Sequence, residues 1–173
     1  NWKRPQAEID VLFNLIRIHL NKKVYELKDA DVNVRFIGSR DKLSKNLIKS
    51  IKLIEDSTRE CTGLQINVAV DYGGRDEIVK IIKEIATDIK SDCLDLSDID
   101  ENLLDQKSVL AHCGRPDLIL RTGGEKRLSN FLLWHSAYSE LSFVDIKWPD
   151  FTAENLIEQV EAFKKRDRKF GDL

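Results

Sequence analysis

The sequence has 173 residues, of which 42% are apolar and 34% are charged, and its formal net charge is −2. This length and apolar fraction predict a single domain, residues 1–173, with one buried core. Because acidic and basic residues are balanced, the chain lacks the excess positive charge that follows a nucleic-acid backbone, and we expect no nucleic-acid partner. No apolar run approaches the roughly 20 residues that span a bilayer.

The cysteines and the first residue carry two further expectations. Cys61, Cys93 and Cys113 form no CxxC pair and leave an odd thiol, which argues against a disulfide framework and against a zinc site. We therefore expect a cytoplasmic protein, with peripheral contact at a membrane surface left open. The sequence contains no methionine and begins at Asn1, so we expect a natural N-terminal segment ahead of it.

The first half of the chain predicts helices and strands in alternation. Residues 8–27 carry two apolar stripes at helical spacing, which predicts a helix that is either deeply buried or lines an apolar cavity. A β-branched run at 32–38 predicts a strand, and apolar residues from Leu43 to Ile54 predict a second helix. Residues 64–70 predict a second strand, which a glycine pair then breaks.

The second half continues this alternation. The predicted elements are a helix over 78–89, a small helix near 101–105 in an acidic loop, strands over 117–120 and 143–146, and a last helix with Thr152 as its N-cap. Strands that alternate with helices predict the α/β class, with an open, mostly parallel sheet covered by helices on both faces.

The segment after the strand at 117–120 has the composition of a phosphate site. Residues 121–130 read RTGGEKRLSN, with three cations, two glycines and a serine. Ligands of parallel sheets bind beyond the carboxyl ends of the strands. Arginines bind phosphate oxygens bidentately, glycines let the backbone approach, and a serine hydroxyl at a helix start adds a donor. The alternative is a solvated basic loop that caps a helix.

Two other features of the sequence leave alternatives open. The strand end DYGGR at 71–75 also combines glycines with a cation, although a turn with positive-φ glycines explains it equally well. Glu140 is a lone carboxylate in the otherwise apolar or small segment 130–142, so it needs a partner. That partner is either a nearby arginine or a hard divalent cation such as magnesium. The three histidines lack ligand-like spacing, and no nucleophile or nucleotide motif occurs.

Four motifs in order, NWKRP, DYGGR, RTGGEKRLSNFLLWHSAYSEL and FVDIKWPDF, resemble undecaprenyl diphosphate synthase, a bacterial cis-prenyltransferase family, over residues 1–171. The resemblance implies a transferase that condenses isopentenyl diphosphate with an allylic diphosphate such as farnesyl diphosphate. The product would be a long-chain polyprenyl diphosphate such as undecaprenyl diphosphate, the lipid carrier for cell-wall peptidoglycan synthesis. It also implies a Mg²⁺ cofactor, a homodimer and a product that partitions to the membrane.

The resemblance assigns roles to individual positions. Asn1 matches an asparagine proposed to help remove a proton, and Trp2 and Arg4 match substrate contacts. The positions that match the binding segment for isopentenyl diphosphate are Arg121, Lys126, Arg127, Leu128 and Ser129. Glu140 matches a magnesium-binding glutamate. The positions that match the lining of a hydrophobic tunnel are Leu12, Leu15, Ile16, Val32, Leu64 and Ile66, with Leu64 toward the floor.

The sequence also departs from the family pattern. Lys126 stands where histidine is common, Asp71 stands where asparagine is common, and Lys169-Phe170-Gly171 replaces an Arg-x-Gly motif that reaches the partner subunit's site. By the same resemblance, the family's central aspartate lies ahead of Asn1, so we expect residues 1–173 alone to lack activity. Two rival functions are a non-catalytic partner subunit, which tends to lose the diphosphate cluster, and an unrelated phosphate-binding α/β enzyme, which needs no tunnel.

Overall fold

The computed structural model describes residues 5–167. The chain divides into two compact units, Asn1–Tyr72 and Gly73–Leu173. The prediction of a single domain stays a prediction. Within the described residues, no helix is both long enough and apolar enough to cross a bilayer.

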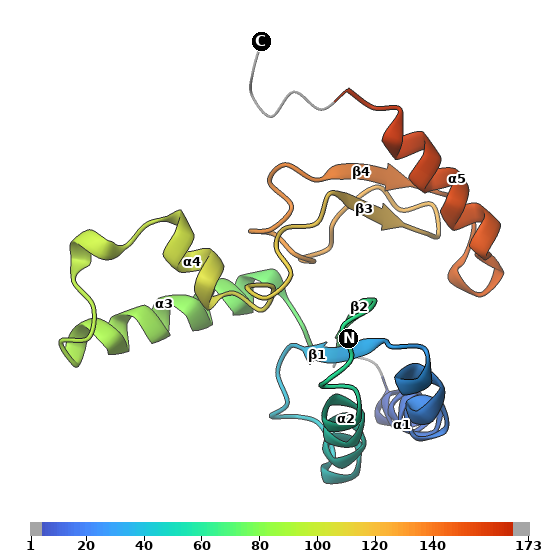
Figure 1. The fold of residues 1–173 in the computed structure, drawn as a ribbon, viewed down its shortest axis with the longest axis horizontal. Coiled ribbons are helices and arrows are strands. Elements are labelled where there is room, and N and C mark those ends of the chain that lie inside the picture. Colours follow the sequence, from blue (N-terminus) through green and yellow to red (C-terminus); the bar gives the residue numbers. More distant parts are fainter. Residues whose placement is uncertain (1–4, 168–173) are drawn as a thin grey trace. The chain divides into compact units, whose positions relative to one another are not determined.

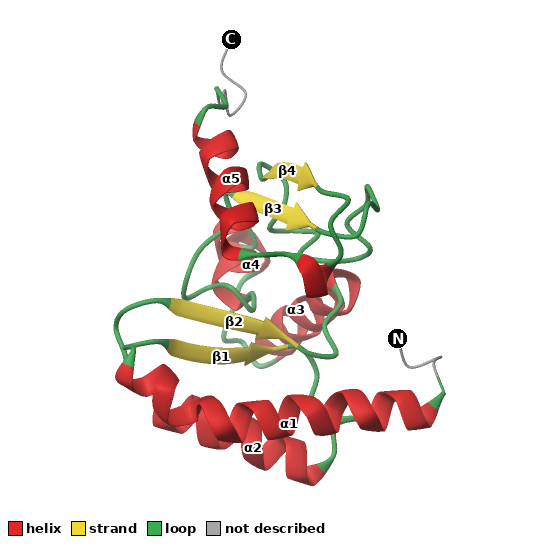
Figure 2. Ribbon diagram, turned by 90° about the vertical axis from the view of Figure 1, so that its right-hand side faces the viewer, coloured by secondary structure: helices red, strands yellow, loops and turns green. Residues whose placement is uncertain are grey.

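The first unit is a pair of parallel strands with helices on one face. Its elements are α1 (Gln6–Asp29), β1 (Asn33–Ile37), α2 (Lys45–Ser57) and β2 (Gln65–Ala69). The strands pair in register from Asn33 with Gln65 to Ile37 with Ala69, and α2 forms the crossover between them. Both α1 and α2 lie on the same side of the sheet, where α2 packs on β1 and α1 packs on α2 (Figures 1 and 2).

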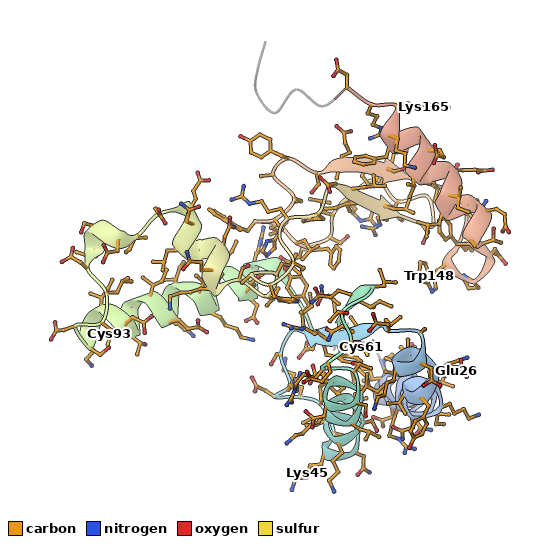
Figure 3. The ribbon with its side chains drawn as sticks, viewed as in Figure 1. Glu26, Lys45, Cys61, Cys93, Trp148 and Lys165 are labelled. Atoms are coloured by element: carbon orange, nitrogen blue, oxygen red, sulfur yellow. The ribbon has the colours of Figure 1, made fainter. Side chains whose placement is uncertain are left out.

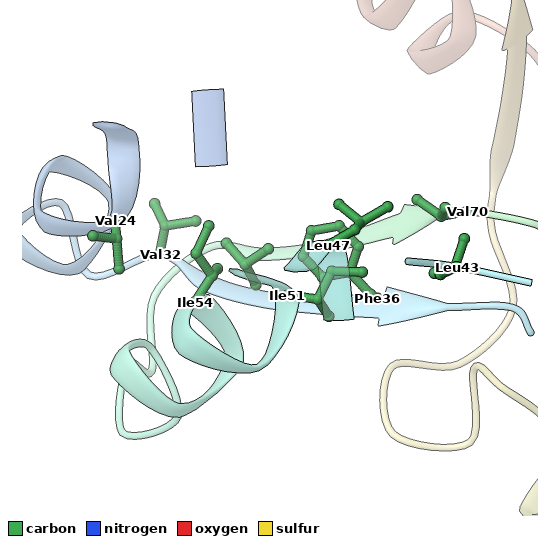
Figure 4. Packing of buried hydrophobic residues seen from close by; sticks show 9 residues of the cluster. Val24, Val32, Phe36, Leu43, Leu47, Ile51, Ile54 and Val70 are labelled. Carbon is green, nitrogen blue, oxygen red and sulfur yellow. The ribbon is translucent and has the colours of Figure 1, made fainter. Parts of the chain in front are cut away.

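Apolar packing between α2 and β1 forms the core of this unit. The spacing of Leu47, Ile51 and Ile54 turns all three side chains inward, and Ile51 and Ile54 are 0% exposed (Figure 4). Burying each such side chain contributes about 1.5–3 kcal/mol. Thr58 closes the end of α2, because its hydroxyl donates to the carbonyl of Ile54 at 2.9 Å and accepts from the Val34 amide at 3.1 Å. The helix is therefore joined to the strand by hydrogen bonds as well as by apolar contact.

The second unit pairs two short parallel strands beside a helix. Its elements are α3 (Gly74–Lys90), η1 (Leu96–Asp98), α4 (Glu101–Lys107), β3 (Leu118–Arg121), β4 (Glu140–Phe143), η2 (Trp148–Asp150) and α5 (Ala153–Lys164). The strands pair from Leu118 with Glu140 to Arg121 with Phe143. The Ser142 hydroxyl donates to Oε1 of Gln159 at 2.6 Å, which ties α5 to β4. Trp148, on the segment before α5, is largely exposed and stacks on Phe151 (Figure 3).

The connection from β3 to β4 contains turns and bends but no helix over residues 122–139. Parallel strands need a crossover of a dozen or more residues, and this crossover is usually a helix. In this unit the crossover is instead the segment that carries the predicted phosphate site. Its local conformation must therefore come from contacts other than helical hydrogen bonds.

The predicted elements are confirmed except near this crossover. The fourth strand is Glu140–Phe143 and not 143–146. The later apolar residues are not part of the β3–β4 pair, because the carbonyls of Val144 and Ile146 accept from the amides of Gly124 and Gly123, both at positive φ. The last helix begins as predicted, since the Thr152 hydroxyl accepts from the Asn155 amide. No helix starts at Ser129, so the prediction that its hydroxyl lies at a helix start was wrong.

Candidate active site

Arg121 organises the segment that follows β3. It is the last residue of that strand, and its Nη1 donates to the Ser129 hydroxyl at 2.9 Å and to the backbone carbonyl of Arg127. These bonds fold residues 121–129 back on themselves. The three residues predicted to bind a diphosphate therefore meet in one place.

A pocket of about 290 Å³ lies at this fold of the chain. It is lined by Ile119, Leu120, Arg121, Arg127, Leu128, Ser129, Phe131 and Phe143. Two guanidinium groups and a hydroxyl supply donors for an anion, and the aromatic and aliphatic side chains supply an apolar wall. The pocket can thus hold a small ligand with an anionic head and a short apolar body. Lys126 is exposed and does not line this pocket.

Gly123 and Gly124 were expected to let the backbone approach a phosphate, but their amides have partners within the protein. The amides of Gly123 and Gly124 donate to the carbonyls of Ile146 and Val144 at 2.9 Å each. Those amides extend the contact between the two strand ends, so they are not donors for a phosphate in this conformation. The anion chemistry of the pocket depends on its side chains.

Glu125 belongs to the cluster, although the sequence argument assigned it no role. Arg127 Nη1 donates to Glu125 Oε2, and this bond holds the pKa of Glu125 below its ordinary value. Both side chains are more than half exposed, and an exposed ion pair of this kind is weak. A bound diphosphate could therefore replace Glu125 as the partner of Arg127 at little cost. The signal available in the sequence was an acidic residue, Glu125, placed two residues before Arg127 in an otherwise basic segment.

Glu140 has an arginine partner, which is one of the two alternatives that the sequence left open. Its Oε2 accepts from Arg166 Nη1 at 2.7 Å, and the same nitrogen donates to the Leu141 carbonyl at 3.1 Å. This arginine follows α5 and is not part of the basic cluster. Glu140 also starts β4 opposite Leu118, three residues before Arg121 in the register, or about 10 Å along the strands.

Within residues 5–167, no group of three or more His, Cys, Asp or Glu side chains could hold a metal ion. Magnesium is commonly held by one or two carboxylates together with water and substrate phosphates. In this structure the Glu140 carboxylate is paired with Arg166, and the magnesium expectation stays a proposal.

A family model described as putative undecaprenyl diphosphate synthase matches residues 1–171. The isoprenyl transferase of Aquifex pyrophilus is 43% identical over 171 residues, which are 99% of this chain and 71% of the relative. The isoprenyl transferase of Bacillus subtilis is 39% identical over 173 residues, 100% of this chain and 66% of the relative.

The chain belongs to the cis-prenyltransferase family. Two solved members share its fold. One is lavandulyl diphosphate synthase from Lavandula x intermedia in complex with dimethylallyl diphosphate, which superposes with a TM-score of 0.96 at 32% sequence identity. The superposition covers 99% of this chain and 75% of the lavandulyl diphosphate synthase chain. The other is a probable undecaprenyl diphosphate synthase from Campylobacter jejuni, with a TM-score of 0.86 at 35% sequence identity. This superposition covers 99% of this chain and 78% of the Campylobacter jejuni chain. The α/β fold class is confirmed, and membership in the cis-prenyltransferases does not by itself select one product.

The predicted tunnel residues of this cis-prenyltransferase lie in two environments within the first unit. Val32 is in the core cluster, and Ile16 and Ile66 pack against it. The remaining three, Leu12, Leu15 and Leu64, are 49%, 48% and 65% exposed. The helix α1 is therefore not deeply buried, and it presents apolar side chains on its surface. A pocket of about 340 Å³ between α1 and the start of α2 contains none of the six.

The remaining positions fall outside the described residues or have a local explanation. Asn1, Trp2, Arg4 and Lys169-Phe170-Gly171 lie outside the described residues, so their roles stay predictions. Asp71 has a φ of 50°, a conformation that asparagine and aspartate adopt more readily than most residues. The replacement of the family's asparagine by aspartate therefore retains the turn.

Proposed function

We propose that this cis-prenyltransferase condenses isopentenyl diphosphate with an allylic diphosphate such as farnesyl diphosphate. The double bond of isopentenyl diphosphate attacks C1 of the allylic substrate, whose bond to the diphosphate oxygen breaks so that diphosphate departs with the electron pair. Loss of a proton from the new unit then gives the cis double bond. The product is a long-chain polyprenyl diphosphate such as undecaprenyl diphosphate, the lipid carrier for cell-wall synthesis.

The observation that supports this proposal most directly is the pocket at residues 119–143. Isopentenyl diphosphate has an anionic head and a five-carbon apolar body, and the pocket combines Arg121, Arg127 and Ser129 with an apolar wall. The side chains hold the diphosphate and orient the double bond, which lowers the barrier through positioning and electrostatic stabilisation. The intact cluster favours a catalytic chain over a non-catalytic partner subunit.

The apolar surface of α1 supports a long product. Leu12 and Leu15 are about half exposed, and an isoprenoid chain that covered them would gain about 0.8 kcal/mol for each buried CH₂ group. We propose that the six tunnel positions contact the growing chain and that Leu64 limits its length. The finished product would then partition to a membrane from a cytoplasmic enzyme, which we expect to be a homodimer.

Magnesium is proposed as the cofactor, with Glu140 as one carboxylate ligand. When bound, it would neutralise charge on the diphosphate groups. Glu140→Gln should raise the Mg²⁺ concentration needed for half-maximal activity and weaken Mn²⁺ binding measured by electron paramagnetic resonance. If the Glu140→Gln variant bound Mn²⁺ with wild-type affinity, Glu140 would not be a metal ligand.

The function is tested with the protein made from the complete gene. It is incubated with radiolabelled isopentenyl diphosphate and either farnesyl or dimethylallyl diphosphate, and the dephosphorylated products are separated by thin-layer chromatography. Long cis products from farnesyl diphosphate are expected. A short product made only from dimethylallyl diphosphate would identify a different prenyl diphosphate synthase, and no incorporation at all would favour the non-catalytic partner subunit.

A further inference from the structure

The first turn of α3 is capped by a residue far away in the sequence. The N-cap of this helix is Gly73, which has no side chain to accept from the free backbone amides of the first turn. Asn130 supplies acceptors for two of these amides, because its backbone carbonyl accepts from the Gly74 amide at 2.7 Å and its side-chain Oδ1 accepts from the Arg75 amide at 2.9 Å. One residue of the β3–β4 crossover therefore replaces the usual local cap.

The same stretch of the crossover has an uncommon backbone conformation. Ser129, Asn130 and Leu132 have φ values of 50°, 66° and 46°, in the left-handed region, which asparagine adopts more readily than most residues but serine and leucine adopt seldom. Such conformations persist only where the surrounding contacts enforce them, and they concentrate at functional sites. Two sets of contacts act here. Arg121 binds the Ser129 hydroxyl from one side, and the start of α3 binds Asn130 from the other.

The glycine pair of the DYGGR motif makes this contact possible. A Cβ atom on Gly73 would lie 2.6 Å from Asn130 Nδ2, and one on Gly74 would lie 2.9 Å from the Leu133 amide nitrogen. A side chain at Gly74 would collide with the backbone of the crossover, and one at Gly73 would push the Asn130 side chain out of its position. The pair therefore has a function beyond ending a strand, since it lets the crossover reach the helix.

A second contact one turn further along α3 holds the same crossover. Glu77 Oε1 lies 3.0 Å from His135 Nε2 and accepts from the Val109 amide at 3.0 Å, and both side chains of the Glu77–His135 pair are buried. The crossover is thus attached to α3 at two points, five residues apart in the crossover. The attachment at Asn130 is the one adjacent to Ser129, which lines the pocket.

We propose that Asn130 is a positioning residue for the isopentenyl diphosphate site. It fixes the crossover on the N-terminus of α3 and thereby holds the Ser129 hydroxyl and the Arg127 side chain in the orientation that receives the diphosphate. The inference rests on the proposed function, because it takes residues 121–129 as the isopentenyl diphosphate site. Without the cap, binding of this substrate must also order the crossover, and its affinity falls.

The test separates the side chain of Asn130 from its backbone. Asn130→Gly retains the positive φ and the backbone carbonyl but removes Oδ1, and Asn130→Asp retains an acceptor whose charge is favoured at a helix N-terminus. We expect Asn130→Gly to raise the KM for isopentenyl diphosphate about five- to tenfold, with the allylic KM unchanged, from the loss of one capping hydrogen bond. Asn130→Asp should restore the KM to within about threefold of wild type. Calorimetric titration with inorganic diphosphate should give the same order of affinities.

Ile85→Ala is the matched control, because Ile85 is a buried residue on the same helix and belongs to neither contact with the crossover. It should lower the Tm and leave the KM for isopentenyl diphosphate unchanged. A wild-type KM for Asn130→Gly, or an equal rise in KM for Ile85→Ala, would overturn the proposal. If the wild-type protein neither bound nor used isopentenyl diphosphate, the proposed function would fail, and wild-type and Asn130→Gly Tm values would still report whether Asn130 caps α3.

Discussion

Both units of the molecule bury apolar side chains, but they differ in how their crossovers are held. Among the described residues, the largest side chains with less than 2% exposure are Leu47, Ile51, Ile54 and Thr58, and they belong to the first unit, where α2 packs on β1. In the second unit, the crossover is fixed by hydrogen bonds from particular polar atoms, among them those of Asn130 and the Glu77–His135 pair. Apolar burial tolerates changes that conserve volume, whereas a hydrogen-bonded network depends on single atoms. The crossover that carries the candidate diphosphate site should therefore tolerate substitution less well than the apolar core of the first unit.

The largest expected effect comes from the apolar core of the first unit. Ile51→Ala removes a fully buried side chain and should lower the free energy of unfolding by about 2–5 kcal/mol, measured by chemical denaturation. The control is Leu53→Ala on the same helix, where the side chain is about half exposed, and it should have a much smaller effect. Equal losses for the two variants would contradict the comparison.

The next effect concerns the diphosphate cluster. Arg121→Ala removes the donor to Ser129 and Arg127, and we expect the KM for isopentenyl diphosphate to rise about 10- to 100-fold, far more than the allylic KM, because a charged hydrogen bond contributes about 1.5–3 kcal/mol. Arg127→Ala should act in the same direction. Steady-state kinetics in which both substrates are affected equally would refute the assignment of the cluster to one diphosphate.

A smaller effect is expected from the polar network around Asp105. Burial opposes ionisation of Asp105, but hydrogen bonds from Trp134 and Arg115 outweigh it and hold the pKa of Asp105 below its ordinary value of 3.8. The ionised carboxylate therefore stabilises the fold fully above that value, and the contribution is lost as pH falls through the lower pKa of the folded state. Stability should fall less steeply below pH 4 in Asp105→Asn than in the wild type. Parallel profiles would show that ionisation of Asp105 does not contribute to the pH dependence of stability.

The smallest effect on stability is expected at Leu64, which is 65% exposed. Leu64→Ala should change the free energy of unfolding by about 0.5 kcal/mol or less, and it should lengthen the products if Leu64 limits the tunnel. Thin-layer chromatography of dephosphorylated products measures the length. Unchanged product lengths would show that Leu64 does not form the tunnel floor.

Sequence reasoning worked where a repeating pattern determines the structure. The spacing of Leu47, Ile51 and Ile54 predicted both the helix and its buried face, because a period of 3.6 residues is a property of the local chain. It failed at 143–146, where apolar composition suggested a strand, but the carbonyls of Val144 and Ile146 instead bind two glycine amides. Composition gives the propensity of a segment and not its hydrogen-bond partners.

Within the candidate site, the residue types were predictable and most of their partners were not. The basic cluster followed from its composition after a strand, and the structure brings Arg121, Arg127 and Ser129 together. The partner of Glu140 is 26 residues away, beyond α5, and the acceptor for Arg75 is 55 residues away in a loop. No periodicity connects such pairs, since they arise only when the chain has folded.

The crossover at 122–139 links ligand binding to the sheet itself. The parallel strands β3 and β4 can pair only when this segment closes, and closing a loop without helical structure costs conformational entropy. A ligand that binds the ordered crossover and not the open one stabilises the paired strands by mass action. Isopentenyl diphosphate should therefore slow amide hydrogen exchange in β3 and β4 more than in β1 and β2, whose crossover is the preformed helix α2. Strand pairing in the second unit would then report occupancy of the site.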